Sequence, residues 1–289
     1  MTIQPSRRAF IKAGAALTAL PLLKPLRAFG QEKTQWPFFA FDNGVGRGSW
    51  PAEKQAATLK ALGYDGISYN YTNNKDLEIW IRVYREARLK IFALYIHTFP
   101  EKKAEPWDPA LREAISLLKG SETALWITFR EATVKGDYDE ACVKIARELG
   151  DLAQAAGVRV VIYHHAGFYV ATASDSLRIA KKASHPAVKP SYNLCHEFMT
   201  GHGNKAMETL RAVAPEAGLI SINGVEPADK KRYILPLGQG SFDTRALLAE
   251  LKRLGYTGPV GHQFYSVPGD IEANLKDAMT AWRLQQPKP

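Results

Sequence analysis

Histidines gather at the ends of the short apolar runs that we predict to be β-strands. Eight such runs cover residues 37–41, 66–70, 90–97, 124–129, 158–165, 188–193, 219–223 and 259–264. Of the seven histidines, five lie at or just beyond the end of a run: His97, His164, His165, His196 and His262. Imidazole has an ordinary pKa near 6.5, so it can accept or donate a proton at neutral pH. This distribution predicts one polar site with histidine acid–base chemistry.

The alternation of side chains along each strand separates residues that face this site from residues that do not. Successive side chains point to opposite faces of a strand, and the apolar set is expected to face the covering helices. Tyr163 and His165 then share the site face of the fifth strand, and His164 points the other way. On the eighth strand Gln263 faces the site and His262 does not. His164 and His262 therefore have an alternative interpretation as histidines packed against helices.

Longer helical stretches separate the strands and begin near residues 51, 74, 109, 138, 174, 204, 242 and 270. Eight strand–helix units in about 260 residues are typical of an α/β protein with a single (β/α)8 TIM barrel, whose active site forms at the carboxyl ends of its strands. A doubly wound open sheet is the alternative. It has little support, because no Gly-x-Gly-x-x-Gly follows the first strand and the glycine-rich loop 44–48 lacks the lysine of a P-loop.

Carboxylates are scarce at the predicted strand ends. Glu131, just beyond the fourth strand, is the best candidate for a catalytic carboxylate near the site. Its alternative role is a solvated residue at a helix start, paired with Arg130 or Lys135. Asp42 and Glu226 are weaker candidates of the same kind.

The N-terminus has the pattern of an export signal. Arg7 and Arg8 precede an apolar run at residues 13–23, and small residues at Ala28 and Gly30 predict cleavage near Gln31. The paired arginines resemble a bacterial twin-arginine signal. Residues 1–30 are therefore expected to be a cleavable signal and residues 31–289 the barrel domain, in a periplasmic or secreted protein. The apolar run is too short for a stable membrane anchor, which needs about 20 residues.

The charge of the chain argues against a nucleic-acid partner. The formal net charge is +9, but the first thirty residues hold five basic residues and no acidic ones. The remaining 33 basic and 29 acidic residues nearly balance, without a basic stripe interleaved with aromatic residues. Two cysteines, Cys142 and Cys195, exclude a disulfide scaffold and a four-thiolate zinc site.

Four segments, in order along the chain, resemble the xylose isomerase-like sugar isomerase/epimerase barrels. Residues 157–165 are similar to the family's fifth strand, and residues 193–196 (Asn-Leu-Cys-His) to its Asp-x-x-His sixth strand. Residues 237–243 (Leu-Gly-Gln-Gly-Ser-Phe-Asp) resemble its Leu-Gly-Glu-Gly-x-Ile-Asp loop, and residues 255–260 its approach to the eighth strand. The resemblance implies a carbohydrate substrate and proton transfer next to a sugar carbonyl. It also implies an oligomer as one possible state.

The same resemblance implies a divalent metal, and here the chain departs from the family. The usual ligands are Glu, Asp, His and Glu, and the corresponding positions hold Tyr163, Asn193, Asn223 (or Ser221) and Gln263. Every anionic ligand is absent, whereas hard divalent cations prefer carboxylate oxygen. These residues resemble a distinct exported branch of the family.

Two chemistries remain open. In the first, His165 and His196 transfer protons while neutral groups bind the substrate: Tyr163, Asn193, Asn223, Gln263 and His97. In the second, a softer transition metal such as Mn, Zn or Co is held by His165, His196, Asn193 and Gln263.

Three functions follow from these options. The first is an exported sugar isomerase or epimerase. A lyase that eliminates from 3-keto-glycosides is its close relative, because elimination also begins by removing an α-proton. The third is a sugar-binding barrel without catalysis. An endonuclease of the abasic-site type is disfavoured, since it needs a carboxylate-rich metal cluster and a basic face.

Overall fold

The computed structural model describes residues 35–130 and 136–287. The predicted signal at residues 1–30 and the candidate Glu131 lie outside the described residues. The rest of the predicted barrel domain can be compared with the structure directly.

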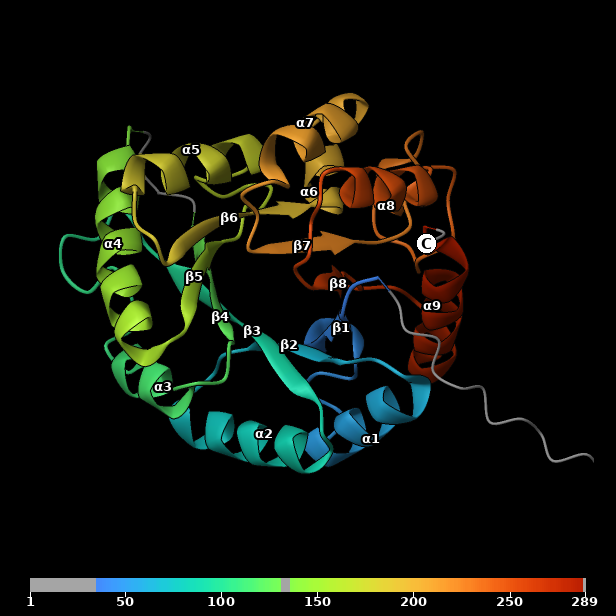
Figure 1. Ribbon diagram of the computed structural model, residues 1–289, viewed down its shortest axis with the longest axis horizontal. Coiled ribbons are helices and arrows are strands. Elements are labelled where there is room, and N and C mark those ends of the chain that lie inside the picture. Colours follow the sequence, from blue (N-terminus) through green and yellow to red (C-terminus); the bar gives the residue numbers. More distant parts are fainter. Residues whose placement is uncertain (1–34, 131–135, 288–289) are drawn as a thin grey trace, which may run out of the picture. The chain divides into compact units, whose positions relative to one another are not determined.

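Eight parallel strands form a closed barrel in which each strand pairs with its sequence neighbour and β8 closes the ring on β1 (Figure 1). The strands are β1 (Phe38–Phe41), β2 (Gly66–Asn70), β3 (Lys90–Thr98), β4 (Ala124–Phe129), β5 (Arg159–Ile162), β6 (Val188–Asn193), β7 (Leu219–Ile222) and β8 (Val260–His262). The predicted (β/α)8 barrel is confirmed, and the open sheet is excluded because an open sheet has two unpaired edges.

The helices form a ring around the strands (Figure 1). They are α1 (Ala52–Leu62), α2 (Asn74–Glu86), α3 (Leu111–Leu117), α4 (Asp139–Ala156), α5 (Ala173–Ala183), α6 (Leu194–Met199), α7 (Ala206–Val213), α8 (Thr244–Arg253) and α9 (Ile271–Gln285). Short 3-10 turns are η1 (Asp42–Gly44), η2 (Gly203–Lys205) and η3 (Lys230–Arg232). Helix α6, directly after β6, was not predicted from the sequence.

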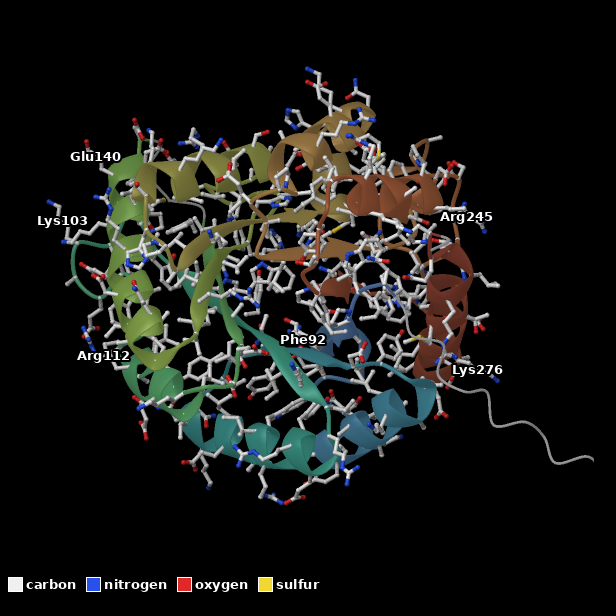
Figure 2. All side chains as sticks on the ribbon, viewed as in Figure 1. Phe92, Lys103, Arg112, Glu140, Arg245 and Lys276 are labelled. Carbon is white, nitrogen blue, oxygen red and sulfur yellow. The ribbon has the colours of Figure 1, made fainter. Side chains whose placement is uncertain are left out.

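Two apolar clusters hold the barrel together. The larger one packs the outer faces of the strands against the helices. The smaller one fills the barrel interior with aromatic residues, among them Phe39, Trp126 and Tyr163. In Figure 2 the side chain of Phe92 lies inside the ring, where it stacks on Phe39 with ring centroids 5.1 Å apart. Gly261 faces the same space, and a Cβ there would lie 2.6 Å from the Phe39 ring.

The described residues contain no helix that is both long and apolar enough to cross a lipid bilayer. Cys142 and Cys195 are both buried as free thiols.

Candidate active site

A pocket of about 380 Å³ opens at the carboxyl ends of the strands. It is lined by Phe41, Asp42, Asn43, Arg47, Ser68, Asn70, Tyr95, His97, Arg130, Tyr163, His165, Phe168, His196, Met199, Ile234, Gln263 and Tyr265. Five of the residues proposed from the sequence are therefore brought together here: His97, Tyr163, His165, His196 and Gln263. They come from β3, from the segment after β5, from α6 and from the segment after β8, so only closure of the barrel makes them neighbours.

The hydroxyl of Tyr163 is the centre of the hydrogen bonds at the pocket floor. Its Oη accepts from Asn193 Nδ2 and, at 3.2 Å, from Gln263 Nε2, and it lies 3.1 Å from His196 Nε2. The ring is held by Trp126 and Tyr95, which pack edge-on with centroids 4.6 and 5.1 Å away. Three side chains from two other segments therefore converge on one phenol oxygen.

The orientation of Gln263 is set by its own neighbours. Its Oε1 accepts from the backbone N–H groups of Phe264 and Tyr265 at 2.8 and 3.1 Å, and from Asn43 Nδ2 at 3.0 Å. The amide NH2 must then point toward Tyr163, because an amide oxygen that receives these donors cannot face a fourth group on the opposite side.

His196 reaches the pocket because helix α6 begins immediately after β6. The backbone N–H of Ala166 donates to His196 Nδ1 at 3.3 Å. A neutral imidazole that accepts at Nδ1 carries its proton on Nε2, so His196 donates to Tyr163 Oη. Burial, and then the neighbouring His165 and His164, lower the pKa of His196 well below 6.5. His196 is therefore a neutral hydrogen-bond donor at the pocket floor, with neither nitrogen free for proton transfer.

His165 and His97 are the imidazoles with a nitrogen available to the pocket. His165 donates from Nδ1 to the carbonyl of Ala166 at 2.7 Å, which leaves the lone pair on Nε2. His97 Nδ1 lies 2.8 Å from Thr128 Oγ1, whose own hydroxyl donates to the carbonyl of Ile96 at 3.3 Å. His97 therefore also carries its proton on Nδ1 and exposes a basic Nε2.

The charge state of both imidazoles follows from their surroundings. Burial and the guanidinium of Arg130 lower the pKa of His165 below its usual value. Burial, then Arg130 and His165, lower the pKa of His97 to about 4. Both are neutral near pH 7, the form that accepts a proton.

Asp42 is the carboxylate among the described residues that line the pocket, and it was only a weak candidate from the sequence. It is 4% exposed, and its Oδ2 accepts the backbone N–H of Asn70 at 2.8 Å. Its Oδ1 lies 3.6 Å from Arg47 Nη1. Burial raises the pKa of Asp42 to about 6, against the opposing effects of the Asn70 N–H and of Arg47. In the sequence, the only sign that Asp42 belongs to the site was its position directly after the first strand.

Replacing Asp42 with asparagine is expected to change how stability depends on pH. Because the folded pKa lies above the unfolded value of 3.8, the folded state binds more protons between these values and wild-type stability falls as pH rises through about 4 to 6. At 1.36 kcal/mol per pKa unit, the variant should gain about 3 kcal/mol relative to wild type between pH 4 and pH 8. Urea unfolding across this range measures the difference. The exposed Asp277→Asn is the control, and a difference for Asp42→Asn that does not vary with pH contradicts the burial argument.

Other sequence candidates lie outside the pocket. Asn223 donates from Nδ2 to the carbonyls of Gly224 and Tyr233 at 2.6 and 2.8 Å, so it holds the segment after β7 and does not face the substrate space. Asn223 is not among the residues that line the pocket, and its role in substrate binding stays a prediction. Glu226 accepts from Ser241 Oγ at 2.8 Å and is not among the residues that line the pocket.

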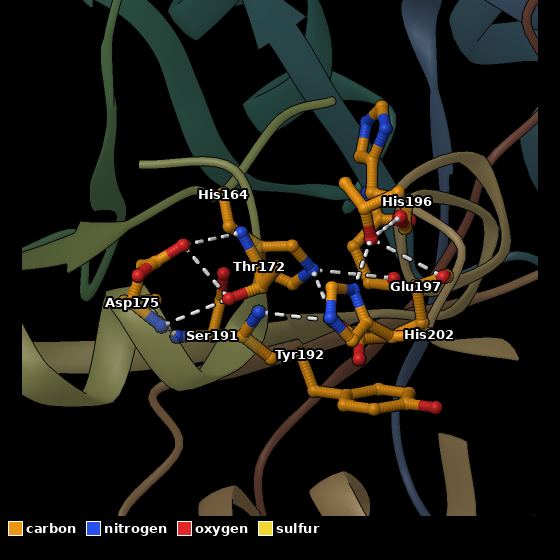
Figure 3. Close-up of polar contacts among 12 residues, drawn as sticks. His164, Thr172, Asp175, Ser191, Tyr192, His196, Glu197 and His202 are labelled. Atoms are coloured by element: carbon orange, nitrogen blue, oxygen red, sulfur yellow. Dashed lines mark hydrogen bonds and ion pairs between the residues drawn. The ribbon is translucent and has the colours of Figure 1, made fainter. Parts of the chain in front are cut away.

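His164 and His262 are fully buried away from the pocket, as the alternative interpretation stated. His164 Nε2 lies 3.3 Å from the carbonyl of Asn193 and 3.5 Å from Glu197 Oε1 (Figure 3). Glu197 also accepts the N–H of Ala173 at the start of α5 at 2.9 Å. This buried carboxylate, which sequence reasoning missed, fixes helix α6 against α5 and so positions His196.

The donor set does not fit the divalent metal that the family resemblance implies. The amides of Asn193 and Gln263 present N–H groups to Tyr163, and N–H groups repel a cation. His196 also presents its N–H there, so of the four ligands predicted from the sequence only His165 keeps a free lone pair, on Nε2. Among residues 35–130 and 136–287, no three His, Cys, Asp or Glu side chains are grouped so that they could hold a metal ion.

An eight-stranded barrel with a polar pocket at the carboxyl ends of its strands defines an enzyme-like TIM barrel. The sequence profile described as "Xylose isomerase-like TIM barrel" matches residues 56–285, and the chain belongs to this family. No curated protein sequence matches the chain.

Solved structures of similar fold include three sugar epimerases. A 3-keto-D-glucoside 4-epimerase from E. coli matches with a TM-score of 0.71 at 14% identity, over 86% of this chain and 99% of that one. A D-allulose 3-epimerase from Methylomonas sp. matches with a TM-score of 0.72 at 15% identity, over 88% and 99%. An L-ribulose 3-epimerase matches with a TM-score of 0.68 at 16% identity, over 87% and 94%. These likenesses establish the fold.

Proposed function

We propose that this protein is a sugar isomerase or epimerase that moves a proton on the carbon next to a sugar carbonyl, without a metal. One observation carries the proposal: a single pocket holds two neutral imidazoles with a free Nε2, His165 and His97, together with the polarised hydroxyl of Tyr163. Three of the solved structures of similar fold are sugar epimerases, which supports the same reaction class.

Tyr163 supplies the electrophile in this mechanism. Burial keeps its pKa well above 10, although the N–H donors of Gln263 and Asn193 lower it, so the hydroxyl stays protonated. The phenol oxygen has two lone pairs, so Oη accepts from two of its three N–H neighbours at a time. None of the three neighbours accepts a proton, and the hydroxyl proton is therefore available to a substrate carbonyl in the pocket. The same donors stabilise the negative charge that develops on Oη as the proton is shared. Tyr163 thus polarises the carbonyl as the metal does in other barrels.

His165 removes the α-proton through Nε2, and the resulting enediolate oxygen is held by the Tyr163 O–H. Return of the proton by His165 to the neighbouring carbon completes an isomerisation, provided that the Tyr163 hydroxyl gives its proton to the carbonyl oxygen and takes one from the adjacent substrate hydroxyl. An epimerisation needs a proton on the other face of the same carbon. Because His97 is neutral, its Nε2 first takes that proton from solvent water and then delivers it, while His165 loses its own proton to solvent. Because the pKa of His97 is near 4, its protonated form gives up a proton readily.

A lyase acting on 3-keto-glycosides is the second candidate. It shares the first step, and a specific feature favours it: Met199, Ile234 and Tyr265 form an apolar edge of the pocket, with Met199 43% and Tyr265 56% exposed. Such an edge suits the apolar aglycone of a glycoside. In elimination the bond from the next carbon to the glycosidic oxygen breaks, and the proton that His165 took from the α-carbon goes to that leaving oxygen instead of back to carbon.

We further propose export by the twin-arginine route, on the basis of Arg7, Arg8 and the following apolar run. Changing both arginines to lysine should retain the protein in the cytoplasm of a bacterial host, as measured by cell fractionation. Unchanged periplasmic recovery contradicts this route.

The reaction is tested by proton exchange in D2O. Methyl 3-keto-D-glucoside, D-allulose and L-ribulose are incubated with the protein, before and after dialysis against EDTA, and the α-proton is followed by NMR. We expect exchange with at least one of these sugars, at the same rate after EDTA. Exchange that disappears with EDTA contradicts the metal-free mechanism, and sugar binding without any exchange identifies the binding barrel instead.

A further inference from the structure

Two arginines lie at the same side of the pocket although 83 residues separate them in the numbering, Arg47 after β1 and Arg130 after β4. Both guanidinium groups lie close enough to the phenol of Tyr95, on β3, to affect its pKa. Burial raises the pKa of Tyr95, and the positive charges of Arg130 and Arg47 oppose this rise. Tyr95 also lines the pocket, so two cations and one phenol O–H border the same part of it.

Arg47 is presented by a tight turn. Gly46 has φ +74° and lies against the Trp50 side chain, where a Cβ would come within 2.6 Å of the indole. The Arg47 N–H donates to the carbonyl of Asp42 at 3.3 Å. The backbone is thus fixed on both sides of Arg47, and this is a structural use for the glycine-rich loop 44–48, which has no P-loop lysine.

Arg130 lies over the ring of Phe168, and this ring stacks on the proposed base His165. Its guanidinium is 5.0 Å from the Phe168 ring centroid, and Phe168 stacks on His165 with centroids 4.2 Å apart. A group bound by Arg130 is therefore one aromatic ring away from His165. No ion pair between Arg130 and a described residue balances its charge, since each ion pair in residues 35–130 and 136–287 involves other side chains.

Among the described residues that line the pocket, the charges do not cancel. Asp42 is the one carboxylate among its described lining residues, against the two guanidinium groups, and it is buried behind Arg47. The opposite edge is apolar and comes from α6 and from the segments after β7 and β8. The pocket is therefore cationic over β1–β4 and apolar over β6–β8.

We propose that the substrate is a sugar carrying an anionic group, which Arg47 and Arg130 bind at the Tyr95 side of the pocket. This inference rests on the proposed function for the reaction and adds the substrate class. The guanidinium fork is suited to bidentate binding of carboxylate or phosphate. Anchoring that end of the sugar positions its carbonyl between Tyr163 and His165, while the remaining end lies along the apolar edge.

The test is a binding measurement on the full chain that needs no turnover. Isothermal titration compares D-glucuronate and D-glucose 6-phosphate with neutral D-glucose. At least one anionic sugar should bind tenfold or more tightly than glucose. If glucuronate binds more tightly than glucose 6-phosphate, the substrate is a sugar acid. If glucose 6-phosphate binds more tightly, the substrate is a sugar phosphate ester. Equal affinities for all three overturn the proposal.

Single and double variants Arg47→Gln and Arg130→Gln locate the anion. Loss of one charge-assisted contact should weaken binding of the anionic sugar by 10- to 100-fold, with little effect on glucose. The matched control is Arg112→Gln, because Arg112 is exposed and packs over Trp107 at 5.1 Å in the same way, but outside the pocket. An equal loss in the control, or no loss in the double variant, overturns the proposal.

The result for the substrate class can be told apart from the result for the proposed reaction. Anion-selective binding that depends on Arg47 and Arg130 supports the substrate class even if no proton exchange is found. Proton exchange with neutral sugars alone supports the reaction and overturns the substrate class.

Discussion

Replacing His165 with asparagine should lower the rate of α-proton exchange by 10²- to 10⁴-fold, the usual contribution of a positioned general base. The structural reason is that His165 alone combines a free Nε2 with a place beside Tyr163 and Phe168. Asparagine keeps a nitrogen where Nδ1 donates to Ala166, so the local backbone should be preserved while the base is removed. The measurement is the NMR exchange rate with the keto sugar that wild type exchanges fastest.

His202→Gln is the matched control for this loss. His202 is exposed on the turn after α6 and bonds Thr200 Oγ1 at 3.1 Å, outside the pocket. Its exchange rate should equal that of wild type. If the His165→Asn variant exchanges the α-proton at the wild-type rate, His165 is not the base. If the variant binds sugar more weakly but still exchanges at the wild-type rate, His165 only binds the substrate.

Tyr163→Phe should reduce exchange by about 10²- to 10³-fold, because one preorganised donor to a developing oxyanion has this magnitude. It should also destabilise the fold by about 1–3 kcal/mol, since Asn193, Gln263 and His196 lose their shared acceptor. The two effects are separated by urea unfolding and by kcat measured at a temperature where the variant is fully folded.

The variant Tyr95→Phe tests whether the effect of Tyr163→Phe is specific to the hydroxyl that polarises the carbonyl. Tyr95 contacts the Tyr163 ring edge-on and lines the same pocket, but its hydroxyl belongs to the cationic side and not to the group of donors around Tyr163. The kcat of Tyr95→Phe should fall much less than the kcat of Tyr163→Phe. Equal losses in kcat for the two variants argue that Tyr163 serves packing alone.

Much of the site could be predicted because strand alternation is a local property. The faces assigned to Tyr163, His165 and Gln263 are the faces found, and His164 and His262 turn away from the pocket. Asn223 was assigned by the same rule and is not among the residues that line the pocket, and its Nδ2 is held by the carbonyls of Gly224 and Tyr233. Alternation predicts the face to which a side chain points, but not the contacts that then hold the side chain.

Roles within the site depended on contacts that no local pattern contains. His196 was expected to transfer protons, but the N–H of Ala166 and the hydroxyl of Tyr163 occupy both of its nitrogens. Asp42 was a weak candidate until the fold placed it in the pocket, where burial raises its pKa against the opposing effect of Arg47.

The sequence by itself determined the class of fold and the end of the barrel that carries the site. Eight apolar runs of strand length, each followed by a helical stretch, allow a parallel sheet to bury both faces of its strands, and polar residues then collect where the strands end. Only the tertiary structure decided the chemistry. Gln263 meets Tyr163 from 100 residues away, Ala166 sets the tautomer of His196, and Arg47 and Arg130 line the same pocket. Hydrogen-bond direction, tautomer and pKa follow from neighbours in space, and ring closure is what makes residues so far apart in sequence into neighbours.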